Sequence, residues 1–366
     1  YMKDFIYRND TKLFFRNNIQ ETILNVAKGH KVMFVYGNGS VKRNGCHNDI
    51  VQALTEARIP FVEYGESSRE FAKIQEGIRL AKANGVTMIV GVGGASVMDS
   101  AKLMAFGFCH EADLWDYVKG KDPYGLERLP LTLIPTYPSS GSENGLGAVS
   151  VDSRTGEFGI TYGIPADYAI LCPKYSLTLS KEMTTYTGLV TLVQLSACVL
   201  GDKNKMSYDA GISYIRNVLE ATQTLQQHPD DLDARGIIMM GASLSTSSRI
   251  GIGKEETFAY DIYELEFLPE KLFGSSYRRS LTSIFPRFLC AMGKHHPEEI
   301  GKYYLDAFGL DSSIEDSSQK LIELFSGLGV EMSYNGQITR EQVDTIPCHT
   351  EFSKEEVFDI INSLIR

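Results

Sequence analysis

The chain has 366 residues, more than one ordinary hydrophobic core supports, so we expect two domains. Apolar residues make up 43% of the sequence and charged residues 22%, values typical of a folded globular protein. The net charge of −10 and the lack of a long basic run argue against nucleic acid or an anionic membrane as a partner.

The sequence also bears on the cellular location of the protein and on the state of its cysteines. No apolar stretch reaches membrane-spanning length and no signal peptide is recognisable, so we expect no membrane association and a cytoplasmic location. The six cysteines are widely spaced and form no C-x-x-C pair, which predicts free, buried thiols rather than disulfides or a cysteine metal site.

Strand and helix patterns alternate through the first half of the chain. We expect strands over residues 31–36, 60–64, 88–91 and 131–135, and helices over residues 48–57, 70–84 and 96–102. This alternation predicts a mostly parallel, Rossmann-like α/β sheet covered by helices. Such sheets bind ligands at the turns that follow their strands.

The second half has helical patterns and no β-rich stretch. We expect helices over residues 187–200, 208–226, 231–247, 281–292, 297–307, 317–328 and 353–365. Ser353 and Glu356 have the spacing of a capping box at the start of the last one. The sequence therefore predicts an α/β domain over residues 1–182 and an all-α domain over residues 183–366.

The segment over residues 87–102 combines a strand, a turn of small residues and a helix. Gly93, Gly94 and Ala95 form the turn, and Ser96 opens the helix. A turn without bulky side chains lets backbone N–H groups approach a phosphate, and the helix dipole favours the negative charge. This segment predicts a bound nucleotide, although a plain tight turn is the alternative interpretation.

Four motifs, in order, resemble the iron-containing alcohol dehydrogenase family, which has the dehydroquinate-synthase-like fold. The G-G-G-S-x-x-D-x-A-K signature is similar to residues 93–102, and the P-T-x-x-x-T-G-S-E loop is similar to residues 135–143. Residues 169–173 resemble A-I-L-D-P with Cys172 in place of Asp, and Thr187-Gly188 follow in the expected order. The resemblance runs over nearly the whole chain.

The resemblance implies a dinucleotide site built from three loops. It places the pyrophosphate on Gly93, Gly94, Ala95 and Ser96, the adenine and ribose side on Thr136 with Ser139 or Ser140, and the nicotinamide ribose near Asp99. For Asp99 and Lys102, three residues apart on a helix, a surface ion pair is the alternative.

The loop after the first predicted strand bears on the choice of cofactor. NAD-specific proteins of such folds place a carboxylate on the ribose hydroxyls, which repels a 2′-phosphate. Gly37, Asn38, Gly39 and Ser40 include no carboxylate, and Lys42 and Arg43 follow closely. We therefore expect NADP(H) rather than NAD(H), with a solvated helix face as the other interpretation of the two cations.

The family holds a divalent metal with Asp and His ligands, and this chain lacks them. The ligand positions fall on Val190 or Thr191, Gln194 or Leu195, Tyr260, and Gly274 or Tyr277, depending on the alignment. None of the seven histidines pairs with another at the i, i+4 spacing of a helix. His295 and His296 are adjacent, and adjacent side chains do not usually face one ion. We expect no bound metal.

A metal-free reductase still needs an acid that protonates the nascent alkoxide. Tyr260 and Tyr277 occupy former ligand positions, and Arg278 and Arg279 follow directly. One hypothesis makes Tyr260 or Tyr277 the acid and an arginine the partner of an anionic substrate group. In the other, the tyrosines only fill the vacated pocket.

The leading interpretation is an NAD(P)-dependent alcohol dehydrogenase, or aldehyde or ketone reductase, that works without metal on a small alcohol or carbonyl compound. The alternative is a nucleotide-binding pseudoenzyme that serves as a sensor or partner protein. A lyase or cyclase like dehydroquinate synthase is a third, but that chemistry also relies on a metal. The resemblance further implies a homodimer.

Overall fold

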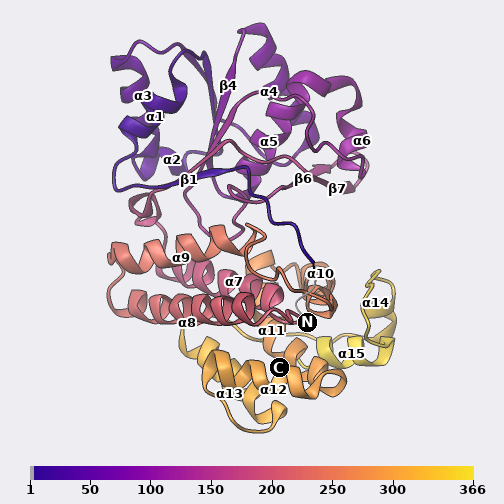
Figure 1. The fold of residues 1–366 in the computed structure, drawn as a ribbon. Helices are drawn as coiled ribbons and strands as arrows, with labels where there is room; N and C mark the ends of the chain where they lie inside the picture. Colours follow the sequence, from indigo (N-terminus) through magenta and orange to yellow (C-terminus); the bar gives the residue numbers. More distant parts are fainter. Residues whose placement is uncertain (1–3) are drawn as a thin grey trace. The chain divides into compact units, whose positions relative to one another are not determined.

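The structure is a computed structural model that describes residues 4–366, and it contains two compact units (Figure 1). We refer to residues 8–179 with 242–247 as the α/β unit. The remaining described residues, 4–7, 180–241 and 248–366, form the helical unit.

The α/β unit is built on a six-stranded sheet in the order β1-β8-β5-β4-β2-β3, with every pair parallel. Its strands are β1 (Lys12–Phe15), β2 (Val32–Tyr36), β3 (Phe61–Tyr64), β4 (Met88–Gly93), β5 (Leu131–Pro135) and β8 (Tyr168–Leu171). The helices between them are α1 (Gln20–Ala27), α2 (Ser40–Arg43), α3 (Cys46–Glu56), α4 (Phe71–Ala83), α5 (Ala95–His110) and α6 (Leu114–Val118). The predicted parallel α/β fold is confirmed.

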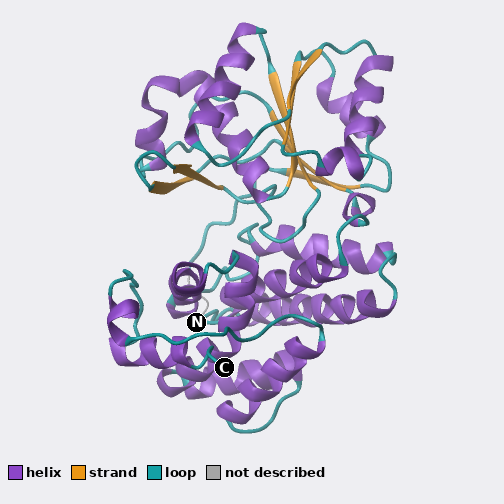
Figure 2. Cartoon of the chain, turned by 180° about the vertical axis from the view of Figure 1, so that it is seen from behind, coloured by secondary structure: helices purple, strands orange, loops and turns teal. Residues whose placement is uncertain are grey.

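Helices cover both faces of this sheet (Figure 2). Along β2, Val32 and Phe34 belong to the apolar core with α1 and α3, whereas Met33 and Val35 belong to the core with α4 and α5. Because successive side chains of a strand point to opposite faces, burial on both faces needs an unbroken apolar run, and V-M-F-V-Y supplies it.

The region between β5 and β8 contains an antiparallel hairpin that the sequence analysis missed. It consists of β6 (Gly147–Asp152) and β7 (Glu157–Tyr162), which form a separate two-stranded sheet. Before β1, residues 4–11 form no strand, and β1 begins at Lys12.

The helical unit has helices and no extended strand over residues 181–366, as predicted. Its helices are α7 (Lys181–Val199), α8 (Lys205–Gln227), α9 (Leu232–Ser245), α10 (Asp261–Phe273), α11 (Tyr277–His295), α12 (Pro297–Phe308), α13 (Ile314–Gly327), α14 (Arg340–Asp344) and α15 (Lys354–Asn362). The capping box of Ser353 and Glu356 is present at the start of α15. Helix α10 was not predicted, and the last turn of α9 belongs to the α/β unit.

The cysteines and the apolar segments of the chain were also subjects of the sequence-based expectations. The six cysteines are free, but Cys46 and Cys172 alone are classed as buried and Cys109 is exposed. Among residues 4–366, no helix is both long and apolar enough to cross a membrane.

Candidate functional site

The turn between β4 and α5 has the geometry that the sequence predicts. β4 ends at Gly93, Gly94 is the extended N-cap residue, and α5 begins at Ala95. No side chain caps this helix, so the backbone N–H groups of its first turn are not used by a capping side chain. A β-carbon on Gly93 would lie 2.9 Å from the Val97 side chain, so the turn tolerates only glycine without a local shift.

The loop that contains Gly37, Asn38, Gly39 and Ser40 lies next to this turn, because β2 pairs with β4 up to the Tyr36–Val92 register. Gly39, directly before α2, has a φ of +84°. A residue with a β-carbon adopts this backbone conformation only with strain. The chain continues from β2 to β3 on one side, whereas β4 lies on the other. The two glycine turns thus flank the topological switch point, where open α/β sheets bind nucleotides.

A third loop reaches the same edge from β5. The Thr136 N–H donates to the Gly93 carbonyl at 2.9 Å, and Thr136 and Ser139 are both buried. Ser140 Oγ accepts from the Ser142 N–H, which makes its side chain part of the loop's own turn. The predicted cofactor-binding residues of all three loops therefore lie together at the carboxyl edge of the sheet.

Asp99 and Lys102 are both buried on α5, so the surface ion pair is wrong for them. Asp99 accepts from Ser142 Oγ at 2.7 Å, from the Val149 N–H at 3.2 Å and from the Arg69 guanidinium at 2.8 and 3.0 Å. These contacts fix the third loop and β6 to α5. Asp99 also has little accepting capacity left for a ribose hydroxyl.

Lys102 extends the same attachment. Its Nζ donates to the carbonyls of Gly145 and Gly147 at 2.7 and 2.9 Å. Burial lowers the pKa of Lys102 to about 8, although the charges of Asp99 and Glu143 oppose that shift. Burial also raises the pKa of Glu143 above its usual value. These buried groups hold the loop after β5 and the start of β6 in place. Both lie at the carboxyl edge of the sheet, which we refer to as the nucleotide edge.

The positions that the sequence comparison aligns with the family's metal ligands hold side chains that do not suit a divalent ion. Whichever register applies on α7, it includes one residue of the apolar core, Val190 or Leu195. Within residues 4–366, no three His, Cys, Asp or Glu side chains form an arrangement that could hold a metal. Because Fe²⁺ and Zn²⁺ need imidazole, carboxylate or thiolate ligands, the donor set at these positions does not fit them.

Tyr260 and Tyr277 both lie near Tyr263 in the helical unit. The Tyr260 ring lies 6.4 Å from the Tyr263 ring, and Tyr277 is the first residue of α11. Burial raises the pKa of Tyr263 well above its usual value, and the neighbouring Tyr277 and Tyr260 add to the shift. Tyr260 and Tyr277 themselves are 43% and 40% exposed.

Lys254 is a functional candidate that the sequence analysis missed. Its Nζ donates to the Ala197 and Leu200 carbonyls at the end of α7 and lies 4.4 Å from the centre of the Tyr260 ring. Burial lowers the pKa of Lys254 to about 8. Nothing in the local sequence, a lone lysine in a glycine-rich loop, indicates this contact.

The two arginines after Tyr277 differ in their surroundings. Arg279 pairs with Glu331 at 2.6 Å, donates to the Ser333 carbonyl and lies over the Tyr334 ring. Arg278 lies 5.7 Å from the centre of the Tyr186 ring. Nη2 of Arg279 is thus already used by the protein, whereas its buried Nε has no hydrogen-bond partner among residues 4–366.

The adjacent histidines also have protein partners. His295 Nε2 lies 2.7 Å from Glu356, and His296 Nε2 lies 2.9 Å from Glu351. The two imidazoles also share Glu351, which lies 4.0 Å from His295 Nδ1, and His296 Nδ1 lies 3.6 Å from Glu256.

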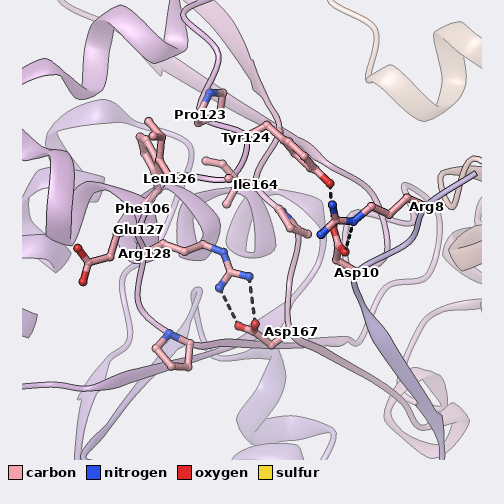
Figure 3. Close-up of a pocket in the computed structure, with 14 residues that line it drawn as sticks. Arg8, Asp10, Phe106, Pro123, Tyr124, Leu126, Glu127, Arg128, Ile164 and Asp167 are labelled. Atoms are coloured by element: carbon pink, nitrogen blue, oxygen red, sulfur yellow. Dashed lines mark hydrogen bonds and ion pairs between the residues drawn. The ribbon is translucent and has the colours of Figure 1, made fainter. Parts of the chain in front are cut away.

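A pocket of about 500 Å³ opens elsewhere on the α/β unit (Figure 3). Its lining residues include those that directly precede β5 and β8, so it lies at the amino edge of the sheet, opposite the glycine turns. The Arg128–Asp167 and Arg8–Asp10 ion pairs lie on its wall. This pocket is separate from the nucleotide edge.

Comparison with known proteins agrees with the motifs. Residues 10–173 match the family described as iron-containing alcohol dehydrogenase. NADH-dependent butanol dehydrogenase A of Clostridium acetobutylicum is 29% identical over 268 residues, which cover 70% of this chain and 68% of the relative. NADPH-dependent aldehyde reductase YqhD of Escherichia coli is 24% identical, covering 78% of this chain and 75% of that protein.

The fold is also similar to that of solved structures. The crystal structure of NADH-dependent butanol dehydrogenase A from Thermotoga maritima aligns with a TM-score of 0.88 and 23% identity, covering 100% of this chain and 99% of that one. Residues 10–173 are thus similar to the iron-containing alcohol dehydrogenase family, and the whole chain has the fold of the Thermotoga maritima structure.

Proposed function

We propose that this protein is an NAD(P)-dependent oxidoreductase that interconverts alcohols with aldehydes or ketones and uses no bound metal. The observation that carries the proposal is the meeting of two glycine turns and an uncapped helix N-terminus at the switch point. Backbone N–H groups and the α5 dipole suit a pyrophosphate there. When bound, the nicotinamide supplies a hydride to the carbonyl carbon, and the product oxygen takes up one proton.

NADP(H) is our proposal for the preferred cofactor. The loop after β2 has no carboxylate, and Lys42 and Arg43 are exposed on α2 directly after it. Lys42 Nζ lies 5.6 Å from the centre of the Tyr36 ring, at the end of β2. The relatives named above include both an NADH-dependent and an NADPH-dependent enzyme, so the preference has to be measured on this protein.

We propose that the metal of the family is absent because its ligand positions hold Tyr260 and core residues of α7. The chemistry that a metal provides elsewhere, polarisation of the substrate oxygen, then has to come from hydrogen-bond donors and charges of the protein.

For the proton we propose Tyr260 first and Tyr277 second. Both side chains are partly exposed, and the Lys254 ammonium faces the Tyr260 ring. A nearby cation stabilises the phenolate that remains after proton transfer. Asp99 is the third residue we assign to the catalytic region, although its hydrogen bonds make it a positioning residue.

Turnover and binding together test the proposal. We expect NADPH to raise the melting temperature more than NADH does, and we expect NADPH oxidation in the presence of short aldehydes. A protein that binds NADPH but turns over none of a broad aldehyde and ketone panel would be the nucleotide-binding pseudoenzyme. A protein whose melting temperature neither cofactor changes would have no nucleotide site.

We also propose a homodimer. The supporting feature is β1, an edge strand whose outer backbone groups pair with no other strand among residues 4–366. Light scattering during size-exclusion chromatography should give twice the chain mass of 40.7 kDa, and the mass of one chain would contradict the proposal.

A further inference from the structure

Arg69 lies at the nucleotide edge but belongs to none of the three predicted loops. It follows β3, in a segment that crosses to the other strands: the Ser67 N–H donates to the Tyr36 carbonyl, and the Ser67 and Ser100 hydroxyls are in contact. The Arg69 carbonyl accepts from the Val151 N–H and from Ser150 Oγ, which fixes its backbone to β6. Its side chain is therefore held over α5 and the hairpin.

The guanidinium is only partly used by the protein. Nε and Nη2 both donate to Asp99 Oδ2, at 3.0 and 2.8 Å. Nη1 makes no hydrogen bond with any residue that the structure describes, and the side chain is 37% exposed, whereas that of Asp99 is 5% exposed. A buried carboxylate thus orients a partly exposed arginine, and its Nη1 donors suit an anionic oxygen group.

The position of Arg69 separates this anion from the phosphates of the cofactor. Its partner Asp99 is the fifth residue of α5, about 6 Å along the helix axis from the first residue at 1.5 Å per residue, beyond the N–H groups that suit the pyrophosphate. The turn after β2 has cations of its own in Lys42 and Arg43. Neither end of the adenosine diphosphate needs Arg69.

We propose that Arg69 binds an anionic group of the substrate, so that the preferred substrates are short aldehydes that carry a carboxylate. This inference rests on the proposed oxidoreductase function, and it names the substrate class of that same site. Arg69 is here a specificity-determining residue, and Asp99 positions it.

The test compares two four-carbon aldehydes that differ in charge, 4-oxobutanoate and butanal, with NADPH as the reductant. We expect wild-type kcat/KM to favour 4-oxobutanoate. In Arg69→Gln, we expect the ratio of kcat/KM for 4-oxobutanoate to kcat/KM for butanal to fall about 10- to 100-fold, the range for one hydrogen bond to a charged group. Arg69→Lys keeps the charge and should lose less, and it provides the test if Arg69→Gln folds poorly.

A binding measurement supplies a readout that does not depend on turnover. Calorimetric titration of succinate into the NADPH-loaded protein should show binding to wild type and weaker binding to Arg69→Gln. Arg154→Gln is the matched control, because Arg154 also pairs with an aspartate, Asp152, but lies 75% exposed on the β6–β7 turn. It should behave as wild type does.

Three results would overturn the inference, and they are distinguishable. If wild type reduces both aldehydes equally well, the oxidoreductase function stands and the substrate class is wrong. If Arg69→Gln weakens NADPH binding and leaves the preference for 4-oxobutanoate intact, the anion belongs to the cofactor. If wild type neither binds NADPH nor reduces an aldehyde, the proposed function itself fails.

Discussion

The contact between Lys254 and Tyr260 is the strongest structural support for a protein-supplied proton. Lys254 lies over the Tyr260 ring, and its Nζ also caps the carboxyl end of α7 through two carbonyls. The charge of Lys254 is thus held beside Tyr260, a position that the sequence comparison aligns with a metal ligand of iron-containing alcohol dehydrogenases. The sequence places Tyr260 there but not Lys254, because the contact depends on how a loop folds back onto α7.

Replacing each tyrosine by phenylalanine tests the acid directly. In Tyr260→Phe, we expect kcat to fall by about 10²-fold or more, because the variant loses a general acid, while the NADPH dissociation constant stays unchanged. Tyr277→Phe is the matched variant, with similar exposure and the same lost hydroxyl. Undiminished turnover in both variants would show that the tyrosines only fill the pocket.

The buried Lys102 predicts a pH dependence of stability. Burial lowers its pKa from 10.5 to about 8, so between these values the unfolded chain binds more protons than the folded one, and the free energy of unfolding rises with pH. Relative to Lys102→Met, wild type should gain on the order of 1–3 kcal/mol from pH 8 to pH 10.5. Urea unfolding of both proteins measures this difference, and Lys254, with a similarly lowered pKa, is present in both. A difference that does not vary with pH would contradict the prediction.

Helix α5 organises the nucleotide edge. Its first turn follows the glycine pair, Val97 lies close to both Gly37 and Gly93, and Asp99 and Lys102 fix the loop after β5 and the start of β6. The strand–turn–helix pattern around this helix was predictable, because it is local. The partners of Asp99 and Lys102 were not, because they lie 30 to 50 residues away in sequence.

Close packing at this turn can be tested with a compensating pair of substitutions. Gly93→Ala brings a β-carbon within 2.9 Å of Val97, so we expect a stability loss of about 1–3 kcal/mol and weaker NADPH binding. Adding Val97→Ala should recover part of both. Gly301→Ala, in α12 with no atom within 4 Å of its added β-carbon, is the control and should not weaken binding. Unchanged NADPH affinity in Gly93→Ala would argue against a phosphate at this turn.

Elements were missed where motifs or short patterns concealed them. The β6–β7 hairpin alternates buried and exposed side chains, for example Thr161 beside the exposed Ile160 and Tyr162, but the segment follows directly on the signature loop. Helix α10 contains Pro269 and begins at the residues compared with the family's histidines. In both segments the periodicity is short, and it overlaps residues that also resemble a family motif.

At the scale of the whole molecule, the two units differ in the features that bear on function. The α/β unit contains the glycine turns and the Thr136 loop that are similar to the family's motifs, whereas the helical unit has no metal-binding cluster among its described residues. Fold class followed from the sequence because alternating β and α patterns give way to helices alone near residue 180. The chemistry of the substituted positions did not, because it depends on tertiary neighbours.

The central claim is that reduction proceeds without a metal, and exhaustive chelation tests it most directly. The protein is treated with EDTA and a second chelator selective for Fe²⁺, its metal content is measured, and NADPH-dependent aldehyde reduction is assayed before and after treatment. We predict that kcat is unchanged at less than about 0.1 metal ion per chain, because the donor set does not fit a divalent ion. Loss of activity on chelation, with recovery on adding Fe²⁺ or Zn²⁺, would contradict the account.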